Sequence, residues 1–429
     1  MAPRVKKSAE ATGEQLVRLT DLLGLPLVDA AGTGVGNVRD IAVRVAAETQ
    51  PIVVGLLVRH DGRDLFVPMA AGRQIAVETG CVRLREGLLP PTAYARRPGE
   101  VLLEHDLLDG TVIDLRGPKV VRVNDVLVEE AISSWLVAGV DVGAGALLHR
   151  LLPRALRRPA APQLVVWSEL ELLSSELPDG ILPADHRRLA RLHPADIARL
   201  AEAVPVRQAT EIVASLDDEL AADTMEEMAD ERQADVVERL DPERAADILE
   251  RMAPDAAADV LAELEPAEVD TMLHRMDPAE AAEAHALLTY PKDTAGGLMT
   301  TDYVIAPADL LAGEAAAYLR PQLAKPDWVY YVYVVSDARE RRLLGVFTLR
   351  DLLLADPTQP LAAVMKRDVR RVGPMTPAPK VAKIMSDYNL LALPVTDAQG
   401  RLLGIVSVDD ALEVVLPPAL RHRLPRIFS

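Results

Sequence analysis

The sequence predicts a multidomain α+β protein: a small duplicated β-barrel comes first, an all-α solenoid of eight twelve-residue repeats follows, and an α/β pair ends the chain. Three internal repeats predict this organisation. Residues 193–288 repeat with a period of twelve, a strand motif that starts at Asp29 starts again at Asp114, and the strand–helix segment 343–353 recurs as 402–412. Such repeats are typical of folds in which equivalent units stack or pair.

The N-terminal region, residues 16–175, is expected to form the β-barrel from two similar halves. The frame D-x-x-G-x-x-V-x-x-V-x-D-[IV]-x-V starts at Asp29 and again at Asp114. In each copy an Asp and Gly turn leads into a strand with alternating apolar residues. Both halves resemble PRC-barrel domains, and the resemblance implies a module for protein contacts rather than for catalysis. Further strands are expected at 51–60, 64–70 and 163–173.

The central region, residues 183–290, is expected to form the solenoid. In the clearest unit, 241–252, apolar residues lie at positions i, i+3, i+4 and i+7, which is the stripe of an amphipathic helix. Proline at the second position of five units is typical of a helix start, because its missing N–H has no partner in the first turn. A helix this short cannot bury its stripe alone, so we expect the helices to stack. The units begin at residues 193, 205, 217, 229, 241, 253, 265 and 277.

The acidic excess of the chain lies in the solenoid. Residues 193–288 contain 26 Asp and Glu and 7 Lys and Arg, a net charge of −19, whereas the whole chain has a net charge of −18. Carboxylates often occupy positions i and i+4, as in Asp255 with Asp259, where like charges repel. One interpretation is an acidic surface that keeps the protein in solution. The other is that Mg²⁺ or another hard divalent cation binds carboxylate oxygens and offsets the repulsion.

Composition argues against several other classes of protein. The single Cys81 excludes an internal disulfide and a cysteine-based zinc site, and fits a reducing cytoplasm. The weakly polar stretch 131–148 carries Asp141 near its centre, where a charge costs about 2.5–3.5 kcal/mol in a membrane. We therefore expect buried strands and turns at 131–148 and no transmembrane segment. The sequence contains no HExxH, GxSxG or GxxxxGK[ST] motif, so no enzymatic activity is expected.

The last third, residues 291–416, contains two copies of an α/β unit, 298–356 and 361–416. The segment LLGVFTLRDLL of the first copy recurs as LLGIVSVDDAL in the second. The pattern G-h-h-[ST]-x-x-D resembles the CBS motif, and two copies make a CBS pair. In that family the hydroxyl and the carboxylate hold the ribose of an adenine nucleotide such as ATP or AMP. The alternative role of these side chains is to cap the helix that follows the strand. The resemblance assigns nucleotide binding to Thr348, Asp351, Ser407 and Asp410.

The junction 290–304, YPKDTAGGLMTTDYV, closely resembles the junction in MgtE magnesium transporters and channels. The resemblance covers about 185–416. It implies that Mg²⁺ binds between a helical N domain and the CBS pair and clamps the closed form of a transmembrane pore. It assigns metal binding to Asp255, Asp259, Asp410 and Glu413.

The sequence departs from that family in two places. Pro377, Pro379 and Asn389 occupy positions where the family has metal-ligating acids, so fewer interfacial sites and a lower sensitivity to Mg²⁺ are expected. The family continues after the CBS pair into an acidic helix and the membrane, whereas residues 417–429 read as a basic, proline-containing tail. Two consecutive prolines break a helix, so we expect the pore to be absent.

Together these features predict a soluble, non-catalytic regulatory protein that responds to Mg²⁺ and acts in magnesium transport or homeostasis. The alternative is an adaptor that senses adenine nucleotides and has no metal role. We expect a cytoplasmic homodimer formed through the CBS domains. A membrane transporter or another protein is the expected partner of the PRC-like module, and such a transporter would hold the chain at the inner membrane. A nucleic-acid partner is not expected for so acidic a chain.

Overall fold

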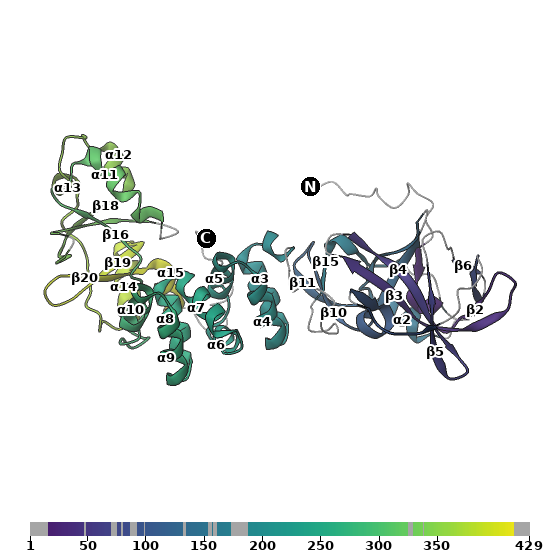
Figure 1. The fold of residues 1–429 in the computed structure, drawn as a ribbon. Coiled ribbons are helices and arrows are strands. Elements are labelled where there is room, and N and C mark those ends of the chain that lie inside the picture. The colour runs from purple at the N-terminus through teal and green to yellow at the C-terminus, as the bar shows by residue number, and fades with distance from the viewer. Residues whose placement is uncertain are drawn as a thin grey trace. The chain divides into compact units, whose positions relative to one another are not determined.

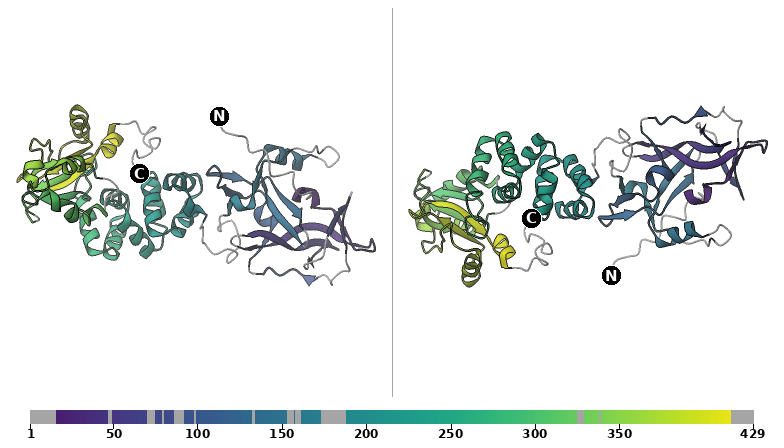
Figure 2. Two further views of the ribbon diagram at one scale, coloured as in Figure 1. Left: turned by 90° about the horizontal axis from the view of Figure 1, so that it is seen from above. Right: turned by 90° about the horizontal axis from the view of Figure 1, so that it is seen from below.

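The structure is a computed structural model, drawn in Figure 1 and Figure 2. The chain divides into two compact units, Met1–Leu216 and Asp217–Ser429, and each has hydrophobic core clusters of its own. The structure describes residues 16–46, 49–69, 75–78, 80–85, 92–97, 99–131, 134–152, 157, 161–172, 188–324, 329–337 and 339–415. The expected basic tail, 417–429, lies outside the described residues.

A curled β-sheet dominates the first unit (Figure 1). Its strands follow the order β1-β12-β13-β4-β3-β2-β7-β6, and β11, β10 and β15 form a second, three-stranded sheet. Valine, leucine and isoleucine side chains fill the core of this unit together with Trp135 and Trp167. The strands are β1 (Leu16–Arg18), β2 (Pro26–Val28), β3 (Gly34–Ala46), β4 (Thr49–His60), β5 (Arg63–Pro68), β6 (Ile75–Glu78), β7 (Cys81–Leu84), β8 (Thr92–Ala93), β9 (Glu100–Leu102), β10 (Thr111–Asp114), β11 (Lys119–Arg122), β12 (Asp125–Glu130), β13 (Trp135–Asp141), β14 (Leu164–Val166) and β15 (Leu170–Leu172). The helical segments of the sheet region are α1 (Leu19–Leu22), η1 (Leu103–Leu107), α2 (Ala144–Leu151) and η3 (Trp167–Glu169).

The two halves of this sheet exchange their first segments. β1 of the first half pairs with β12 of the second, and β9 of the second half pairs with β3 of the first. Asp40 on β3 accepts hydrogen bonds from the N–H groups of Glu104 and His105 in η1, at 2.7 and 3.0 Å. Asp125 on β12 accepts from the N–H and the hydroxyl of Thr20 in α1, at 3.2 and 2.6 Å. Asp40 and Asp125 occupy the same position of the repeated frame, so each half satisfies the helical turn of the other.

Two expectations for this region need correction. The stretch 131–148 was expected to hold only strands and turns, but β13 is followed by the helix α2. Alanine and leucine are strong helix formers. Ala146 of α2 is buried whereas Leu148 and Leu151 are exposed, so this segment is not packed on one face as a strand of the sheet would be. The expected strand 163–173 is divided into β14 and β15 by the 3₁₀ turn η3. In the described ranges no helix has the length and apolarity that a membrane crossing requires.

Short helices with starts about one sequence repeat apart occupy the described residues 194–287. α3 and α4 belong to the first unit, after the 3₁₀ turn η5 (Leu189–Arg191), and the others belong to the second. In the second unit each helix packs chiefly against the helix two positions along: α5 with α7, α6 with α8, α7 with α9, and α8 with α10. The packing period is therefore two sequence repeats. The helices are α3 (Pro194–Ala203), α4 (Val206–Ser215), α5 (Asp218–Glu226), α6 (Asp230–Val237), α7 (Pro242–Arg251), α8 (Pro254–Glu263), α9 (Pro266–Arg275) and α10 (Pro278–Leu287).

Side chains of the repeats satisfy the exposed N–H groups at the helix starts. Asp241 and Asp277 cap their own helices. Ala253 has no side chain that can cap α8, and its N–H donates instead to Glu226 Oε1 at the end of α5, at 2.6 Å. Glu250 Oε1 near the end of α7 accepts in the same way from the N–H of Asp277, at 2.5 Å, before α10. Polar contacts therefore join the end of one helix to the start of the helix three positions along, in addition to the packing between helices two positions apart.

The C-terminal part of the second unit consists of two small α/β halves. In the first half, β16 pairs with β17 in parallel and β17 pairs with β18 antiparallel. In the second half, β19 pairs with β20 antiparallel, and Val372 adds a parallel bridge to Val395. The elements are β16 (Val304–Pro307), α11 (Ala312–Leu319), η6 (Gln322–Ala324), β17 (Val332–Val335), β18 (Leu343–Phe347), α12 (Leu349–Leu354), α13 (Leu361–Val364), α14 (Ala378–Tyr388), β19 (Ala392–Thr396), β20 (Leu402–Ser407) and α15 (Val408–Val415).

These two halves also exchange the segments that precede them. Thr300, which precedes strand β16 of the first half, pairs with β20 of the second, and Lys366, which precedes strand β19 of the second half, pairs with β18 of the first. The motif glycines allow this close approach. A Cβ atom at Gly404 would lie 2.7 Å from the carbonyl oxygen of Thr300, and one at Gly345 would lie 2.7 Å from that of Lys366. The first residue of the G-h-h-[ST]-x-x-D pattern is therefore required by backbone packing.

Candidate functional site

Asp255 lies in the first turn of α8, which begins at Pro254, and Asp259 lies one turn further along the helix. Asp255 Oδ1 is buried and accepts no hydrogen bond in the described part of the chain. Burial raises the pKa of Asp255 to about 8, the Asp410 carboxylate adds to the increase, and a hydrogen bond with Thr300 opposes it. A buried carboxyl oxygen without a partner is costly, and a cation or a proton would relieve that cost.

Asp410 comes from the other side of this site, in the first turn of α15. Its Oδ2 accepts hydrogen bonds from Ser407 Oγ at 2.5 Å and from the N–H of Ser407 at 3.3 Å. The negative charge of Asp410 raises the pKa of both Asp255 and Asp259. The structure therefore brings Asp255, Asp259 and Asp410 into one electrostatic environment, although they come from two elements far apart in the sequence.

Asp259 is in contact with a positive charge. Burial raises its pKa to about 6, Lys292 opposes this increase, and the carboxylates of Asp230 and Asp410 add to it. Lys292 Nζ lies 3.7 Å from Asp259 Oδ1 and 2.8 Å from Glu263 Oε1. Desolvation lowers the pKa of Lys292, but its hydrogen bond to Glu263 and the nearby carboxylates outweigh that effect and raise it. The site is thus an acidic cluster with one ammonium group at its edge.

The remaining metal candidate, Glu413, belongs to α15, but its side chain lies outside the described part of the structure. Among the described residues, no group of three His, Cys, Asp or Glu side chains is arranged to hold a metal ion. Asp255 Oδ1, which has no partner in the described ranges, and the neighbouring carboxylates nevertheless fit a hard cation, since Mg²⁺ prefers oxygen ligands and keeps several of its waters.

Sequence reasoning missed three charged residues of this cluster. Glu226, the last residue of α5, raises the pKa of Asp255, and Asp230, the first residue of α6, raises that of Asp259. Both influence acids of α8, and the packing of α6 on α8 brings these helix ends together. The period of the sequence does not reveal which repeats become neighbours. Lys292 was missed because it lies in the junction, outside the repeat.

The nucleotide candidates form hydrogen-bonded pairs at two equivalent helix starts. Thr348 and Asp351 make a capping box around the start of α12, with Thr348 Oγ1 donating to Asp351 Oδ2 at 2.8 Å. Backbone hydrogen bonding from Thr348 lowers the pKa of Asp351, so this carboxylate is ionised at neutral pH. Ser407 and Asp410 make the same contacts at the start of α15. The capping role considered from the sequence is therefore present at both positions.

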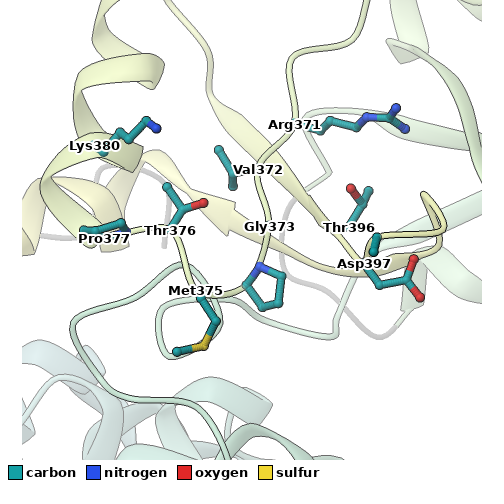
Figure 3. Close-up of a pocket in the computed structure, with 11 residues that line it drawn as sticks. Arg371, Val372, Gly373, Met375, Thr376, Pro377, Lys380, Thr396 and Asp397 are labelled. Carbon is teal, nitrogen blue, oxygen red and sulfur yellow. The ribbon is translucent and has the colours of Figure 1, made fainter.

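Two pockets in the second unit bear on the nucleotide prediction. The larger, about 690 Å³, lies in the second α/β half, and Figure 3 shows Lys380 and Arg371 on opposite sides of it. The smaller, about 10 Å³ and lined by several tyrosines, cannot hold a nucleotide. None of the four candidate nucleotide residues lines either pocket.

Three residues that replace metal-ligating acids of the family lie at the two ends of α14 and shape its backbone. Pro377 is the N-cap of α14, and Pro379 lies in its first turn, where proline is tolerated. Asn389 ends α14 in the left-handed conformation, with φ of 51°, which asparagine adopts more readily than most residues.

Comparison with known proteins identifies the C-terminal half. Residues 192–293 match the MgtE intracellular N domain, and residues 295–357 and 361–417 match the CBS domain. This half of the chain is an MgtE N domain followed by a CBS pair. The resemblance predicted from the junction and the CBS motif is confirmed, and the chain contains the modules of the cytosolic part of MgtE.

Curated relatives show the extent of the similarity. The magnesium transporter MgtE of Thermus thermophilus is 43% identical over 134 residues, which is 31% of this chain and 29% of the relative. The magnesium transporter MgtE of Enterococcus faecalis is 39% identical over 135 residues, 32% of this chain and 29% of the relative. The chain thus spans less than a third of the length of these relatives.

A solved structure of the cytosolic domain of the Mg²⁺ channel MgtE in complex with ATP matches with a TM-score of 0.50 and 36% identity. The match covers 53% of this chain and 92% of that one. The N domain and CBS pair therefore occur together here, as they do in that cytosolic domain.

Proposed function

We propose that this chain is a non-catalytic, Mg²⁺-responsive regulator in magnesium transport or homeostasis, with Mg²⁺ held by Asp255, Asp259, Asp410 and Glu413. The observation that carries the proposal is that Asp255 Oδ1 is buried and has no hydrogen-bond partner among the described residues. The similarity to the cytosolic domain of a Mg²⁺ channel supports the choice of ion.

The side chains of the N domain and the CBS pair would couple this ion to conformation. Ala258 of α8 and Ala411 of α15 belong to one core cluster, so the acids of both helices flank an apolar contact. Ionisation of Asp255 near Asp410 is unfavourable there, as its raised pKa indicates. Repulsion between these carboxylates opposes closure of α8 onto α15. A bound divalent cation supplies positive charge that offsets this repulsion and favours the closed form by mass action.

Calorimetric titration of Mg²⁺ into the wild type and into Asp255→Ala/Asp259→Ala tests the proposal. We expect binding heat and a smaller scattering radius with Mg²⁺ for the wild type, and neither for the double variant. Glu231→Ala/Asp235→Ala is the matched control, because it removes two exposed i, i+4 acids from the neighbouring helix α6. Identical heats and radii in all three proteins would reject the metal site.

We also propose an adenine nucleotide such as ATP or AMP as a ligand of Thr348, Asp351, Ser407 and Asp410. The CBS pair and its similarity to a domain solved with ATP support this assignment. Asp351→Asn separates the two ligands, since Asp351 belongs to the nucleotide set alone and asparagine can still accept the capping hydrogen bonds. We expect this variant to lose ATP binding and to keep Mg²⁺ binding. Loss of nucleotide binding in Asp351→Asn, with no Mg²⁺ response in any variant, would favour an adaptor that senses nucleotides only.

The module assignments complete the proposal. Residues 16–175 act as a PRC-type interaction module, 183–290 as the helical N domain, and 291–416 as the CBS pair with halves 298–356 and 361–416. The CBS pair forms a homodimer, and the PRC-type module delivers the conformational change to a partner such as a membrane transporter in the cytoplasmic membrane. The duplicated, exchanged strands of the first unit support a folded module there. Capture of a membrane protein by the full chain, and loss of this capture when residues 16–175 are deleted, tests the partner assignment.

A further inference from the structure

Lys292 reaches across from the junction to the acidic side of α8. Its Nζ lies 2.8 Å from Glu263 Oε1, 3.7 Å from Asp259 Oδ1 and 3.4 Å from the backbone carbonyl oxygen of Asp259. Glu263 and Asp259 are one turn apart on the same helix face. The ammonium group therefore bridges two carboxylates and one carbonyl dipole of a single helix.

The backbone around Lys292 is tied to the second α/β half, so the side chain links two parts of the unit. The N–H of Ala295 donates to the carbonyl of Thr376 at 2.8 Å, and the N–H of Ala378 donates to that of Asp293 at 2.9 Å. Gly297 permits the tight turn, because a Cβ atom there would lie 2.3 Å from the carbonyl oxygen of Pro291. The segment that follows Lys292 is thus hydrogen-bonded to the CBS pair, and the ammonium group of Lys292 contacts the N domain.

We propose that Lys292 is a tethered cation that stabilises the closed arrangement of α8 on the CBS pair and competes with Mg²⁺ for Asp259. This inference rests on the proposed Mg²⁺ response and adds a residue that sets its sensitivity. A lysine charge is present at every Mg²⁺ concentration, so it offsets part of the repulsion among Asp230, Asp259 and Glu263 without free ion. Because it engages Asp259, it must be displaced or share that carboxylate when Mg²⁺ binds.

Lys292→Gln tests the inference in the full-length chain, with Lys383→Gln as the matched control. Lys383 forms an exposed ion pair with Asp387 of its own helix α14, with Nζ 3.0 Å from Oδ2. In a metal chelator we expect Lys292→Gln to melt several degrees below both the wild type and Lys383→Gln. In calorimetry we expect Lys292→Gln to bind Mg²⁺ about 3- to 10-fold more tightly, because Asp259 no longer has a competing partner. Lys292→Arg keeps the charge and should behave as the wild type in both measurements.

The outcomes separate this inference from the proposed function. If the wild type binds Mg²⁺ but Lys292→Gln matches it in melting temperature under chelation and in Mg²⁺ affinity, the tethered cation is rejected and the Mg²⁺ response stands. If neither the wild type nor any variant binds Mg²⁺, the proposed Mg²⁺ response is rejected, and the inferred competition between Lys292 and Mg²⁺ is rejected as well. If Lys292→Gln is less stable in chelator, recovers with Mg²⁺ and binds Mg²⁺ more tightly than the wild type, while Lys383→Gln does not change, the inference holds.

Discussion

At the level of single residues, the local environment decides which carboxylates of the acidic repeats have raised pKa values. Glu231 and Asp235 have the same spacing as Asp255 and Asp259, but both of their side chains are exposed. Water screens the exposed pair, whereas Asp255 has a buried oxygen and lies near Asp410, and Lys292 lies 3.7 Å from the half-exposed Asp259. A charge count from the sequence gives all these acids equal weight, although their surroundings differ.

The raised pKa values predict that the second unit loses stability as the pH rises. The pKa of Asp255 is about 8 and that of Asp259 about 6, against about 4 in an unfolded chain. Between about pH 4 and pH 8 the folded state holds protons that the unfolded state has released. The stability from this protonation is complete below about pH 4 and is lost as the pH rises through the folded-state values.

We expect scanning calorimetry in chelator to show the second unit melting at least about 2–4 °C lower near pH 8 than near pH 5, which corresponds to roughly 1 kcal/mol. Asp255→Asn should remove most of this dependence because the amide does not titrate. Asp247→Asn, an exposed change on α7, should leave the dependence as in the wild type. Equal pH slopes in all three proteins would contradict the assignment.

Among the secondary-structure elements, duplication is followed by exchange in both modules that contain strands. In the first unit, Asp40 and Asp125 each satisfy a helical turn of the other half. In the CBS pair, Thr300 and Lys366 each add an edge bridge to the other half. Exchange makes the halves of a pair interdependent, because each leaves backbone groups that only the other satisfies.

Gly404→Ala should test the exchange in the CBS pair. The added Cβ atom would meet the carbonyl oxygen of Thr300 at 2.7 Å, and backbone cannot shift as a flexible side chain would. We expect a loss of about 1–3 kcal/mol in the free energy of unfolding, measured by denaturant titration. Gly373→Ala is the control, since its nearest neighbouring atom is 4.0 Å away, and a similar loss there would mean that strand approach is not the cause.

Glu250→Ala should test the caps between helices three positions apart. Glu250 accepts from the N–H of Asp277 at the start of α10, and alanine would leave that donor to water. We expect a loss of about 1 kcal/mol in the free energy of unfolding, the usual value of a helix cap. Asp247→Ala, exposed on the same helix, should change it by less than about 0.5 kcal/mol. Comparable losses in both variants would indicate a propensity effect instead.

Across the full chain, charge is segregated by module. The eight repeats, residues 193–288, carry a net charge of −19, and the entire chain carries −18. The rest of the chain is therefore nearly neutral. Such a field favours cations near the N domain over anions, and monovalent salt weakens it by screening. A specific divalent site would add to that general effect.

A comparison of salts at equal ionic strength separates screening from binding. We expect MgCl₂ to raise the melting temperature of the full chain more than NaCl does, because binding to the folded state adds to screening. Asp255→Ala/Asp259→Ala should respond to the two salts equally. An equal response in the wild type would mean that Mg²⁺ acts only through ionic strength.

The order of the modules, the helix starts and the strand motifs could be predicted because they depend on local spacing. Apolar residues three and four apart and proline at a helix start act within one helix, and the [ST]-x-x-D part of the CBS pattern acts within one turn. Asp255, Asp259 and Asp410 could be named as candidates through the resemblance at the junction, and the structure brings these three together. The prediction of a single strand across 163–173 was wrong, because a 3₁₀ turn interrupts it. The alternation of apolar residues does not reveal such a turn.

The twelve-residue period, the concentration of acidic residues in the repeats and the family of the C-terminal half depend on the order of residues alone. The sequence by itself therefore determined them. The neighbours within the acidic cluster are a property of the folded chain. Four residues show this. Glu226 and Asp230 raise the pKa values of the acids of α8, Asp255 keeps an oxygen without a hydrogen-bond partner among the described residues, and Lys292 reaches α8 from the junction. The physical reason is that a charge responds to everything within a few ångströms in a medium of low polarity, and packing between helices that are not consecutive decides what lies there.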